Sequence, residues 1–432
     1  MNIAQLHALY LQHPTICTDT RKVSNGCLFF ALKGNKYNAN QFANEAINNG
    51  AAYAIIDEKE YEISQKTILV NNVLETLQQL ATFHRDTLKI PVIAIVGSNG
   101  KTSTKELITS VLKQKFNVLA TPGNFNNHIG LPLTILQITK EHDIAVIEMG
   151  ANHVGENAFL CEIARPNYGV ITNNGKDHLE GFGSMEGVAL SNSELYYYLL
   201  KNKGIAFVNA NDEWLMRMSK QLQNKITYSA NFEGRNGSAK ITCYARTLQP
   251  TIKFYINNNG EVVTANLSGD YNFDNIAVAV AMGIHFKIKL NSIGKGIEEY
   301  FPKNNRSEII KKQFNTIYMD AYNANPSSVE VALKSFAAMP FAFKTVILGD
   351  MFELGKYAEK EHQNMVDLCK HLNLKNVYLC GENYQKTRNN FHTFQSTNDC
   401  KEYLKLNPLK NTNVFMKGSR SMRLEDLLEV IN

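Results

Sequence analysis

One short segment, Gly97-Ser98-Asn99-Gly100-Lys101-Thr102-Ser103, carries the residue types and the spacing that bind phosphate in proteins. Its glycines let the backbone turn tightly, so that successive N–H groups and the lysine ammonium converge on one anion. The pattern is G-x-x-G-K-T, shorter than the common G-x-x-x-x-G-K-[ST] loop, because Ile95 stands where that loop has its first glycine. We call residues 97–103 the phosphate loop.

The residues around the phosphate loop predict the strand and the helix that must position it. Residues 90–96 are almost entirely apolar and are typical of a buried strand. Helix-forming residues follow, and Leu107, Val111 and Leu112 are spaced for one apolar face. A strand, a glycine loop and a helix in this order are the context that phosphate binding requires.

Two further strand candidates end in side chains that could hold a cation. Residues 144–150 are a strand candidate whose end contains an acid, Glu148, and a glycine, and residues 168–173 precede a polar segment that contains His178. In open parallel sheets, ligands lie beyond the carboxyl ends of the strands, so both residues can meet the phosphate loop. The Thr102 hydroxyl and the Glu148 carboxylate are suitable Mg²⁺ ligands for a bound triphosphate. Taken alone, His178 is more typical of a hydrogen-bonding loop histidine.

Composition narrows the class of protein. The net charge of +5 over 432 residues is small and the basic residues are scattered, so nothing indicates nucleic-acid binding. The N-terminus lacks a secretory signal, and no run approaches the ~18 apolar residues of a membrane span. The seven cysteines are dispersed and never form C-x-x-C, which favours reduced thiols over disulfides or zinc. We therefore expect a cytoplasmic protein without a membrane span.

Alternating strand and helix patterns predict three α/β domains at residues 1–88, 89–303 and 304–432. The first domain has strand candidates at 26–32 and 52–56 and helix candidates at 40–49 and 74–88. The second should contain a mostly parallel sheet, with a loop at 121–132, a helix at 191–201, and a hairpin of residues 251–256 and 261–267 around 257–260. The third has strand candidates at 316–319, 345–348, 377–379 and 414–416.

Polar segments predict a binding face on the third domain. Residues 320–326, 349–355 and 417–421 each follow a strand candidate, so all three should lie along one edge of its sheet. In the second domain, Asn272 and Asn275 are three residues apart on a predicted helix and share a face. They could cap the helix or read the edge of a base with their side-chain amides.

Together these segments resemble the Mur ligases, the ATP-dependent ligases of peptidoglycan synthesis, nearly from end to end. The resemblance is carried by residues 18–21, 29–34, 97–102, 124–130, 148–150, 178–180, 322–326, 349–355 and 417–421. It implies a small nucleotide-sugar-binding domain, a central ATP-binding domain with the phosphate loop, and a Rossmann-like C-terminal domain. It also implies the use of ATP and Mg²⁺. We expect a monomer, although the sequence does not determine the oligomeric state.

The reaction that the resemblance implies joins a carboxylate to an amine. The terminal carboxylate of a UDP-N-acetylmuramoyl-tripeptide would attack the γ-phosphate of ATP, and D-alanyl-D-alanine would then displace phosphate from the acyl phosphate. Residues 322–326 and 417–421 favour this family member over a sibling that adds an earlier peptide residue, or glutamate to folate. A nucleotide-binding homologue that has lost catalysis is the remaining alternative. The third residue of the tripeptide, diaminopimelate or lysine, stays open.

The resemblance also implies roles for individual residues. Lys101 would bridge phosphates within the phosphate loop, Thr102 and Glu148 would hold the magnesium of ATP, and His178 would help to hold a second magnesium. The remaining contacts would be to adenine (Asn272, Asn275), phosphate (Arg306), ribose (Asp320), the uridine nucleotide (Thr20, Arg21, Lys33) and the peptide (Asn126, Asn323, Asn325, Ser419).

Three positions depart from the family pattern. Most members have a carbamylated lysine, a ligand of the second magnesium, where this chain has Asn192. Asn192 or a water could serve instead, Glu194 could substitute, or the second metal could bind more weakly; we favour the first. Tyr271 replaces a histidine in the base-contacting motif, and residues 38–42 differ from the pattern of the sugar-nucleotide domain.

Overall fold

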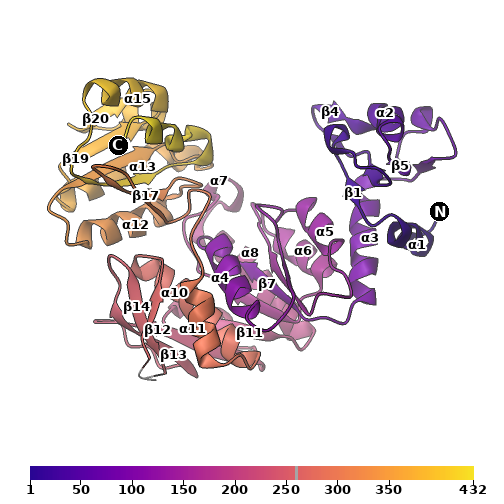
Figure 1. The fold of residues 1–432 in the computed structure, drawn as a ribbon, viewed down its shortest axis with the longest axis horizontal. Coiled ribbons are helices and arrows are strands. Elements are labelled where there is room, and N and C mark those ends of the chain that lie inside the picture. Colours follow the sequence, from indigo (N-terminus) through magenta and orange to yellow (C-terminus); the bar gives the residue numbers. More distant parts are fainter. Residues whose placement is uncertain (258–260) are drawn as a thin grey trace.

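The computed structural model describes residues 1–257 and 261–432, which form three α/β domains (Figure 1). The first domain has a parallel four-stranded sheet in the order β1-β2-β5-β6. It confirms the predicted strands and helices of this region. Its elements are α1 (Ile3–Gln12), β1 (Ile16–Cys17), β2 (Leu28–Phe30), β3 (Lys33–Gly34), β4 (Tyr37–Asn38), α2 (Ala43–Asn48), β5 (Tyr53–Ile56), β6 (Thr67–Leu69) and α3 (Val73–Thr87).

The central domain has a nine-stranded sheet in the order β15-β14-β13-β12-β11-β10-β7-β9-β8. In this order, every pair of neighbouring strands between β13 and β8 is parallel. Strands β14 and β15 pair antiparallel and form the edge next to β13. The strands are β7 (Val92–Val96), β8 (Val118–Ala120), β9 (Ile144–Glu148), β10 (Tyr168–Ile171), β11 (Ile205–Asn209), β12 (Lys225–Asn231), β13 (Ile241–Thr247), β14 (Ile252–Ile256) and β15 (Val263–Ala265).

Helices cover both faces of the central sheet. One face packs against α4 (Lys101–Leu112), α10 (Asp270–His285) and α11 (Leu290–Glu298), and the other against α5 (Gly130–Ile135), α6 (Glu156–Ala164) and α8 (Met185–Lys201). Two short helices, α7 (Leu179–Phe182) and α9 (Glu213–Met218), complete the domain.

Two predicted element boundaries in the central domain were wrong. The segment predicted as a loop at 121–132 ends in helix, because α5 begins at Gly130 and tolerates Pro132 in its first turn. Helix α8 begins six residues before the predicted Ser191, because the Ser184 side chain accepts a hydrogen bond from Gly187 N and caps it. The predicted hairpin strands pair as β14 and β15. Residues 258–260 of its turn lie outside the described residues.

The C-terminal domain has a six-stranded sheet in the order β16-β17-β21-β18-β19-β20, parallel except for the edge strand β16. All four predicted strands are present, and two short strands, β16 and β20, were not predicted. The elements are β16 (Glu308–Lys311), β17 (Thr316–Asp320), α12 (Pro326–Ala338), β18 (Lys344–Gly349), α13 (Ala358–His371), β19 (Asn376–Cys380), α14 (Glu382–Gln385), β20 (His392–Phe394), α15 (Thr397–Leu406) and β21 (Asn413–Lys417).

The first and central domains share one apolar core. Figure 1 shows α3 running beside α5 and α6, against which it packs. Leu28 and Phe30 of β2 belong to the same buried cluster as Leu131 of α5 and Ile147 of β9. The separate sheets support domain ranges of 1–88, 89–303 and 304–432, which we keep as a proposal, but the core does not break at the first boundary.

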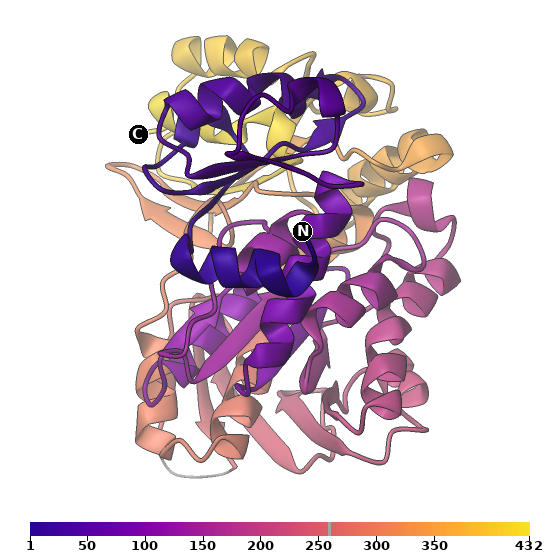
Figure 2. The same ribbon diagram turned by 90° about the vertical axis from the view of Figure 1, so that its right-hand side faces the viewer.

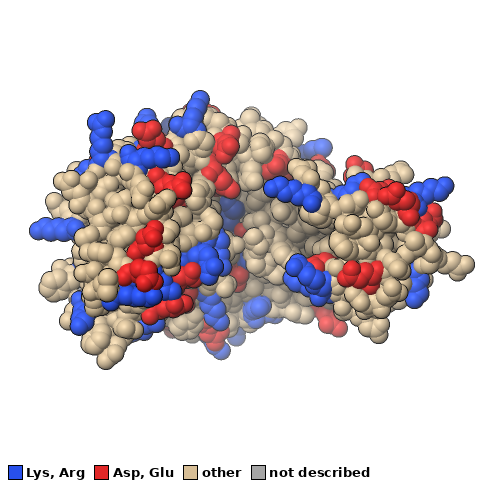
Figure 3. Space-filling model, turned by 90° about the horizontal axis from the view of Figure 1, so that it is seen from above, with Lys and Arg blue, Asp and Glu red and all other residues tan. Residues whose placement is uncertain are grey.

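The first and third domains stand on the same side of the central domain, as the two ribbon views agree (Figures 1 and 2). The molecular surface is hollowed between these two lobes, and acidic and basic side chains are mixed on both (Figure 3). Across residues 1–257 and 261–432, no helix combines the length and the apolar character needed to cross a bilayer.

Candidate active site

A cavity of about 730 Å³ lies where the central and C-terminal domains meet. The phosphate loop, the ends of β9 and β10 and the start of α10 line it from the central domain, and the segment between β17 and α12 lines it from the C-terminal domain. Fifteen residues with predicted site roles line the cavity: Ser98, Asn99, Gly100, Lys101, Thr102, Ser103, Asn126, Glu148, His178, Asn272, Asn275, Arg306, Asp320, Asn323 and Asn325.

Sheet order explains why these residues meet. Strand β7 lies between β9 and β10, with Glu148 in register with Ile95 and Ile171 in register with Val96. The three strands are parallel, so the segments that follow them emerge at one edge. In the C-terminal domain, β17, β21 and β18 are likewise neighbours, which confirms that the three polar segments share one edge.

The phosphate loop needs its glycines. Gly97 has φ +127°, and a Cβ there would lie 2.2 Å from Thr172 Oγ1 and 2.9 Å from Thr172 N. Gly100 has φ +79° and caps α4, which begins at Lys101. The Lys101 ammonium folds back onto the loop, donates to Ser98 O at 3.2 Å, and lies 4.0 Å from Asp177 Oδ2. It is therefore held over the loop by groups that a phosphate oxygen could replace.

Glu148 is buried, and only one of its two carboxylate oxygens accepts a hydrogen bond from the described residues. Its Oε1 accepts from Asn126 Nδ2 at 2.9 Å, and its backbone N–H donates to Thr121 Oγ1 at 2.9 Å. Its Oε2 is buried and has no hydrogen-bond partner in the part of the chain that the structure describes. A buried carboxylate oxygen without a donor, beside the phosphate loop, fits a divalent cation.

His178 has a strained backbone and a partner in the other domain. Its φ is +44°, and Nδ1 lies 2.7 Å from Glu353 Oε2 of the C-terminal domain. Nε2 lies 3.6 Å from Asp177 Oδ1. Burial lowers the pKa of His178, but the hydrogen bond to Glu353 and the charge of Asp177 outweigh it, so the net pKa is raised.

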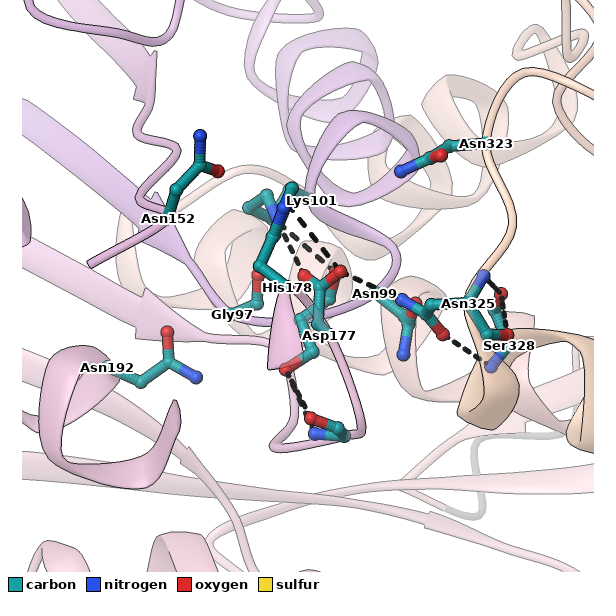
Figure 4. A network of polar contacts seen from close by, with 12 residues as sticks. Gly97, Asn99, Lys101, Asn152, Asp177, His178, Asn192, Asn323, Asn325 and Ser328 are labelled. Carbon is teal, nitrogen blue, oxygen red and sulfur yellow. Dashed lines mark hydrogen bonds and ion pairs between the residues drawn. The ribbon is translucent and has the colours of Figure 1, made fainter. Parts of the chain in front are cut away.

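Asn325 connects the phosphate loop to the C-terminal domain (Figure 4). Its side-chain oxygen caps α12 by accepting from Ser328 N at 2.8 Å. Its Nδ2 donates to Asn99 Oδ1 at 2.8 Å and to Asp177 Oδ1 at 3.1 Å. One side chain therefore begins a helix in one domain and fixes two loops of the other.

Arg306 and Asp320 lie at the C-terminal wall of the cavity. The Arg306 guanidinium stacks over the Tyr322 ring, 3.5 Å from its centroid. Asp320 Oδ2 accepts from the buried ammonium of Lys417 at 2.6 Å. Tyr322 and Lys417 line the same cavity, so Arg306 and Asp320 are each held by a neighbour.

Asn272 and Asn275 lie in the first two turns of α10, and Asn275 packs against the phosphate loop. Asn275 Oδ1 accepts from Thr104 Oγ1 at 2.9 Å, and a Cβ at Gly100 would lie 2.8 Å from it. Asn272 Nδ2 donates to Ser268 O at 2.8 Å. Both side-chain amides therefore already form hydrogen bonds within the protein. Tyr271 lines the cavity beside them.

Some predicted residues lie away from this cavity. Thr20, Arg21 and Lys33 belong to the first domain, where Arg21 pairs with Asp19 and Lys33 with Glu58. Ser419 is not among the residues that line the cavity, and its Oγ accepts from Phe352 N at 3.1 Å. Gly97 and Asn192 line a smaller neighbouring pocket. Asn192 donates to Asn174 Oδ1 at 2.8 Å and lies apart from Lys101 in Figure 4.

Sequence reasoning missed several residues that shape the site. Asp177, Glu353, Tyr322 and Lys417 all contact predicted site residues, yet none was given a role. All four lie in segments that had been singled out after strands, so their position was a usable signal.

The fold and the site define a multidomain α/β protein in which the phosphate loop of the central domain faces a second α/β domain across a cavity. Family models match along most of the chain: the catalytic domain of the Mur ligase family at residues 15–85, the Mur ligase middle domain at 95–283, and the Mur ligase glutamate ligase domain at 305–420. The chain belongs to the Mur ligase family.

Individual relatives match over nearly the whole chain. The UDP-N-acetylmuramoyl-tripeptide–D-alanyl-D-alanine ligase of Buchnera aphidicola is 34% identical, covering 99% of this chain and 94% of the relative. The Bacillus subtilis enzyme of the same name is 32% identical, covering 96% and 92%. MurF from Acinetobacter baumannii has a TM-score of 0.85 at 27% identity, covering 99% and 98%. MurF ligase from Thermotoga maritima in complex with ADP also has 0.85, at 26% identity, covering 97% of each chain.

Proposed function

We infer that this protein is an ATP-dependent, ADP-forming ligase that joins D-alanyl-D-alanine to a UDP-N-acetylmuramoyl-tripeptide in peptidoglycan precursor synthesis. The names of its near full-length relatives support this function. The observation that carries it is the shared cavity, which brings the phosphate loop together with the C-terminal segment 322–326. A cavity between two domains can hold a nucleotide on one side and an amine acceptor on the other.

The reaction requires activation because a free carboxylate is a poor acyl donor. A carboxylate oxygen of the tripeptide attacks the γ-phosphorus of ATP, the bond to the β-phosphate oxygen breaks, and ADP leaves. The dipeptide amine then attacks the carbonyl carbon of the acyl phosphate, loses a proton, and expels inorganic phosphate. The protein contributes orientation and charge stabilisation.

We propose that ATP lies on the phosphate loop. The N–H groups of residues 98–103 and the Lys101 ammonium would bind its phosphates, as helix N-termini and lysines do. Arg306 would reach the phosphates from the opposite wall, Asn272 and Asn275 would contact adenine, and Asp320 would contact the ribose. The position of all these side chains around one cavity supports these roles.

We propose Thr102 and Glu148 as the residues that hold the Mg²⁺ of ATP. The unpartnered Glu148 Oε2 supports this choice. When bound, Mg²⁺ neutralises charge on the phosphate oxygens during transfer. His178 would contribute to a second site, for which its Nε2 is the nitrogen outside the Glu353 pair. Asn192, which bonds Asn174 in the neighbouring pocket, stays a prediction for this site.

The remaining roles concern the two substrates. Thr20, Arg21 and Lys33 would bind the uridine nucleotide on the first domain, across the hollow seen in Figure 3. Asn126, Asn323, Asn325 and Ser419 would face the peptide. Asn126 and Asn325 also have structural partners in Glu148 and Asn99. We further propose a cytoplasmic monomer, and the free thiols of all seven cysteines are consistent with a reducing compartment.

Coupled ADP release tests this function. We expect ADP release that requires both a UDP-muramoyl-tripeptide and D-alanyl-D-alanine, and that disappears in Lys101→Ala. Tripeptides that end in diaminopimelate or lysine should be compared in parallel. Turnover with a free amino acid in place of the dipeptide would favour a sibling ligase. ATP turnover without ligation would favour a homologue that has lost catalysis.

A further inference from the structure

Lys105 is a buried lysine beside the proposed metal ligand. It lies on α4, four residues after Lys101, and none of its side chain is exposed. Its ammonium donates to Thr121 O at 2.7 Å and lies 3.8 Å from Glu148 Oε2. A third neighbour, Glu106 Oε1, is 3.1 Å away, but that side chain is 45% exposed. The proposed reaction does not use Lys105 directly.

Buried charges of opposite sign compensate one another here. An isolated buried ammonium or carboxylate is strongly destabilising, whereas a close pair is tolerated. The side chains of Lys105 and Glu148 are 0% and 3% exposed, so water screens their attraction little. Glu148 Oε2 accepts no hydrogen bond from the described residues, but it therefore faces a cation that the protein itself supplies.

The same lysine also fixes the position of Glu148. It holds the Thr121 carbonyl, and the Thr121 hydroxyl accepts from Glu148 N. Asn126 holds the other carboxylate oxygen. The carboxylate is thus fixed at its backbone and at Oε1, while Oε2 stays open to a ligand.

We propose that Lys105 is a positioning residue that balances the charge of Glu148, so that a divalent cation binds only together with a nucleotide. This inference rests on the proposed function, because it takes Glu148 as a metal ligand. Without nucleotide, an entering cation meets one carboxylate whose charge is already matched and one neutral hydroxyl, Thr102. Among residues 1–257 and 261–432, no three His, Cys, Asp or Glu side chains gather into an alternative metal site. The phosphates of ATP supply the missing negative charge.

Manganese binding without nucleotide tests the proposal. Free Mn²⁺ is measured by electron paramagnetic resonance during titration of the wild type, Lys105→Gln and Lys105→Met. Glutamine keeps a donor for the Thr121 carbonyl but removes the charge, and methionine removes both. We expect both variants to bind nucleotide-free Mn²⁺ at least about tenfold more tightly than the wild type. A gain of affinity is not a result that structural damage produces.

Two controls keep the result interpretable. Lys113→Met removes the same charge from an exposed position at the end of α4 and should leave nucleotide-free Mn²⁺ binding unchanged. The wild type should bind Mn²⁺ tightly only when a non-hydrolysable ATP analogue is added, a measurement that needs no variant. Tight nucleotide-free binding by the wild type, or unchanged affinity in a folded Lys105→Gln protein, would overturn the proposal. Nucleotide-dependent Mn²⁺ binding without ligation would instead refute the proposed function alone.

Discussion

His178 and Glu353 meet across the junction of the central and C-terminal domains, and each has a left-handed backbone. Their φ angles are +44° and +62°, and Nδ1 of one lies 2.7 Å from Oε2 of the other. A non-glycine residue in this region costs about 1–2 kcal/mol, so strain is stored on both sides of one contact. The hydrogen bond from His178 lowers the pKa of Glu353, which keeps that carboxyl ionised. The Nδ1 atom of His178 is therefore occupied by the bond to Glu353, and its Nε2 atom is left for other partners.

Replacing Glu353 should impair catalysis more than nucleotide binding. Glu353→Gln removes the charge that orients the imidazole, and partners of this kind typically contribute about 10–100-fold in activity. We expect kcat to fall within that range while KM for ATP changes less, as measured by steady-state ADP release. Glu359→Gln, on the exposed side of α13, is the matched control. An unchanged kcat in Glu353→Gln would show that the pair has no catalytic consequence.

Asn325 both caps α12 and binds the central domain, and a second helix-capping residue, Ser396, allows the two roles to be separated. Asn325 and Ser396 both begin helices through capping boxes, but only Asn325 reaches the central domain. Alanine at either position should lower stability by about 1 kcal/mol. Only Asn325→Ala should lower kcat/KM, by about 10–100-fold, because it misaligns the two domains. Equal activities in the two variants would contradict this assignment.

The phosphate loop should reject a methyl group at Gly97 for reasons of space. Gly97→Ala places a Cβ against the Thr172 backbone, whereas a Cβ at Gly155, with φ +97°, would meet no atom of the described residues within 4 Å. Gly155→Ala should cost about 1–2 kcal/mol for its left-handed backbone. Gly97→Ala should cost a further 1–3 kcal/mol or so for overpacking. Urea denaturation measures both, and equal losses would rule out the clash.

Acid should weaken the joint between the first and central domains. His7 Nε2 lies 3.0 Å from His84 Nδ1, and His84 Nε2 lies 2.8 Å from Ile138 O. Burial lowers the pKa of both histidines below the ordinary 6.5, so the folded state holds them neutral while the unfolded state takes up protons. The contribution of this pair to the free energy of unfolding should therefore be constant above pH 6.5 and fall as the pH drops from there toward the lowered pKa values.

Melting temperature against pH checks this expectation. His84→Phe should flatten the dependence below pH 6.5, because one of the two buried proton acceptors is gone. His371→Gln, an exposed histidine at the end of α13, should keep the wild-type slope. A wild-type slope that persists in His84→Phe would assign the effect to other groups.

Much of the architecture was predictable because local patterns determine it. The apolar run before the phosphate loop predicted β7, and Glu148 and His178 were placed at strand ends that do converge. The two missed strands of the C-terminal domain, β16 and β20, are short and only half-buried, so their pattern is weak. A parallel sheet allows the edge of a site to be inferred even before its strand order is known.

Contacts between domains could not be read in the same way. Asn99 and Asn325 are 226 residues apart, and no periodicity links them. The burial of Lys105 was not predicted, because lysine on a helix usually faces water. Its burial follows from the placement of α4 against β9 and the 121–129 loop, which the sequence of the helix alone does not contain.

The shared core of the first two domains makes the two joints of this molecule mechanically unequal. Opening the joint at α3 would expose apolar side chains such as Leu77 and Leu80 to water, whereas the junction with the C-terminal domain exchanges mostly polar contacts. We expect the first and central domains to move as one rigid body, and the C-terminal domain to move relative to them. The acceptor amine would then be carried to a carboxylate that is already seated.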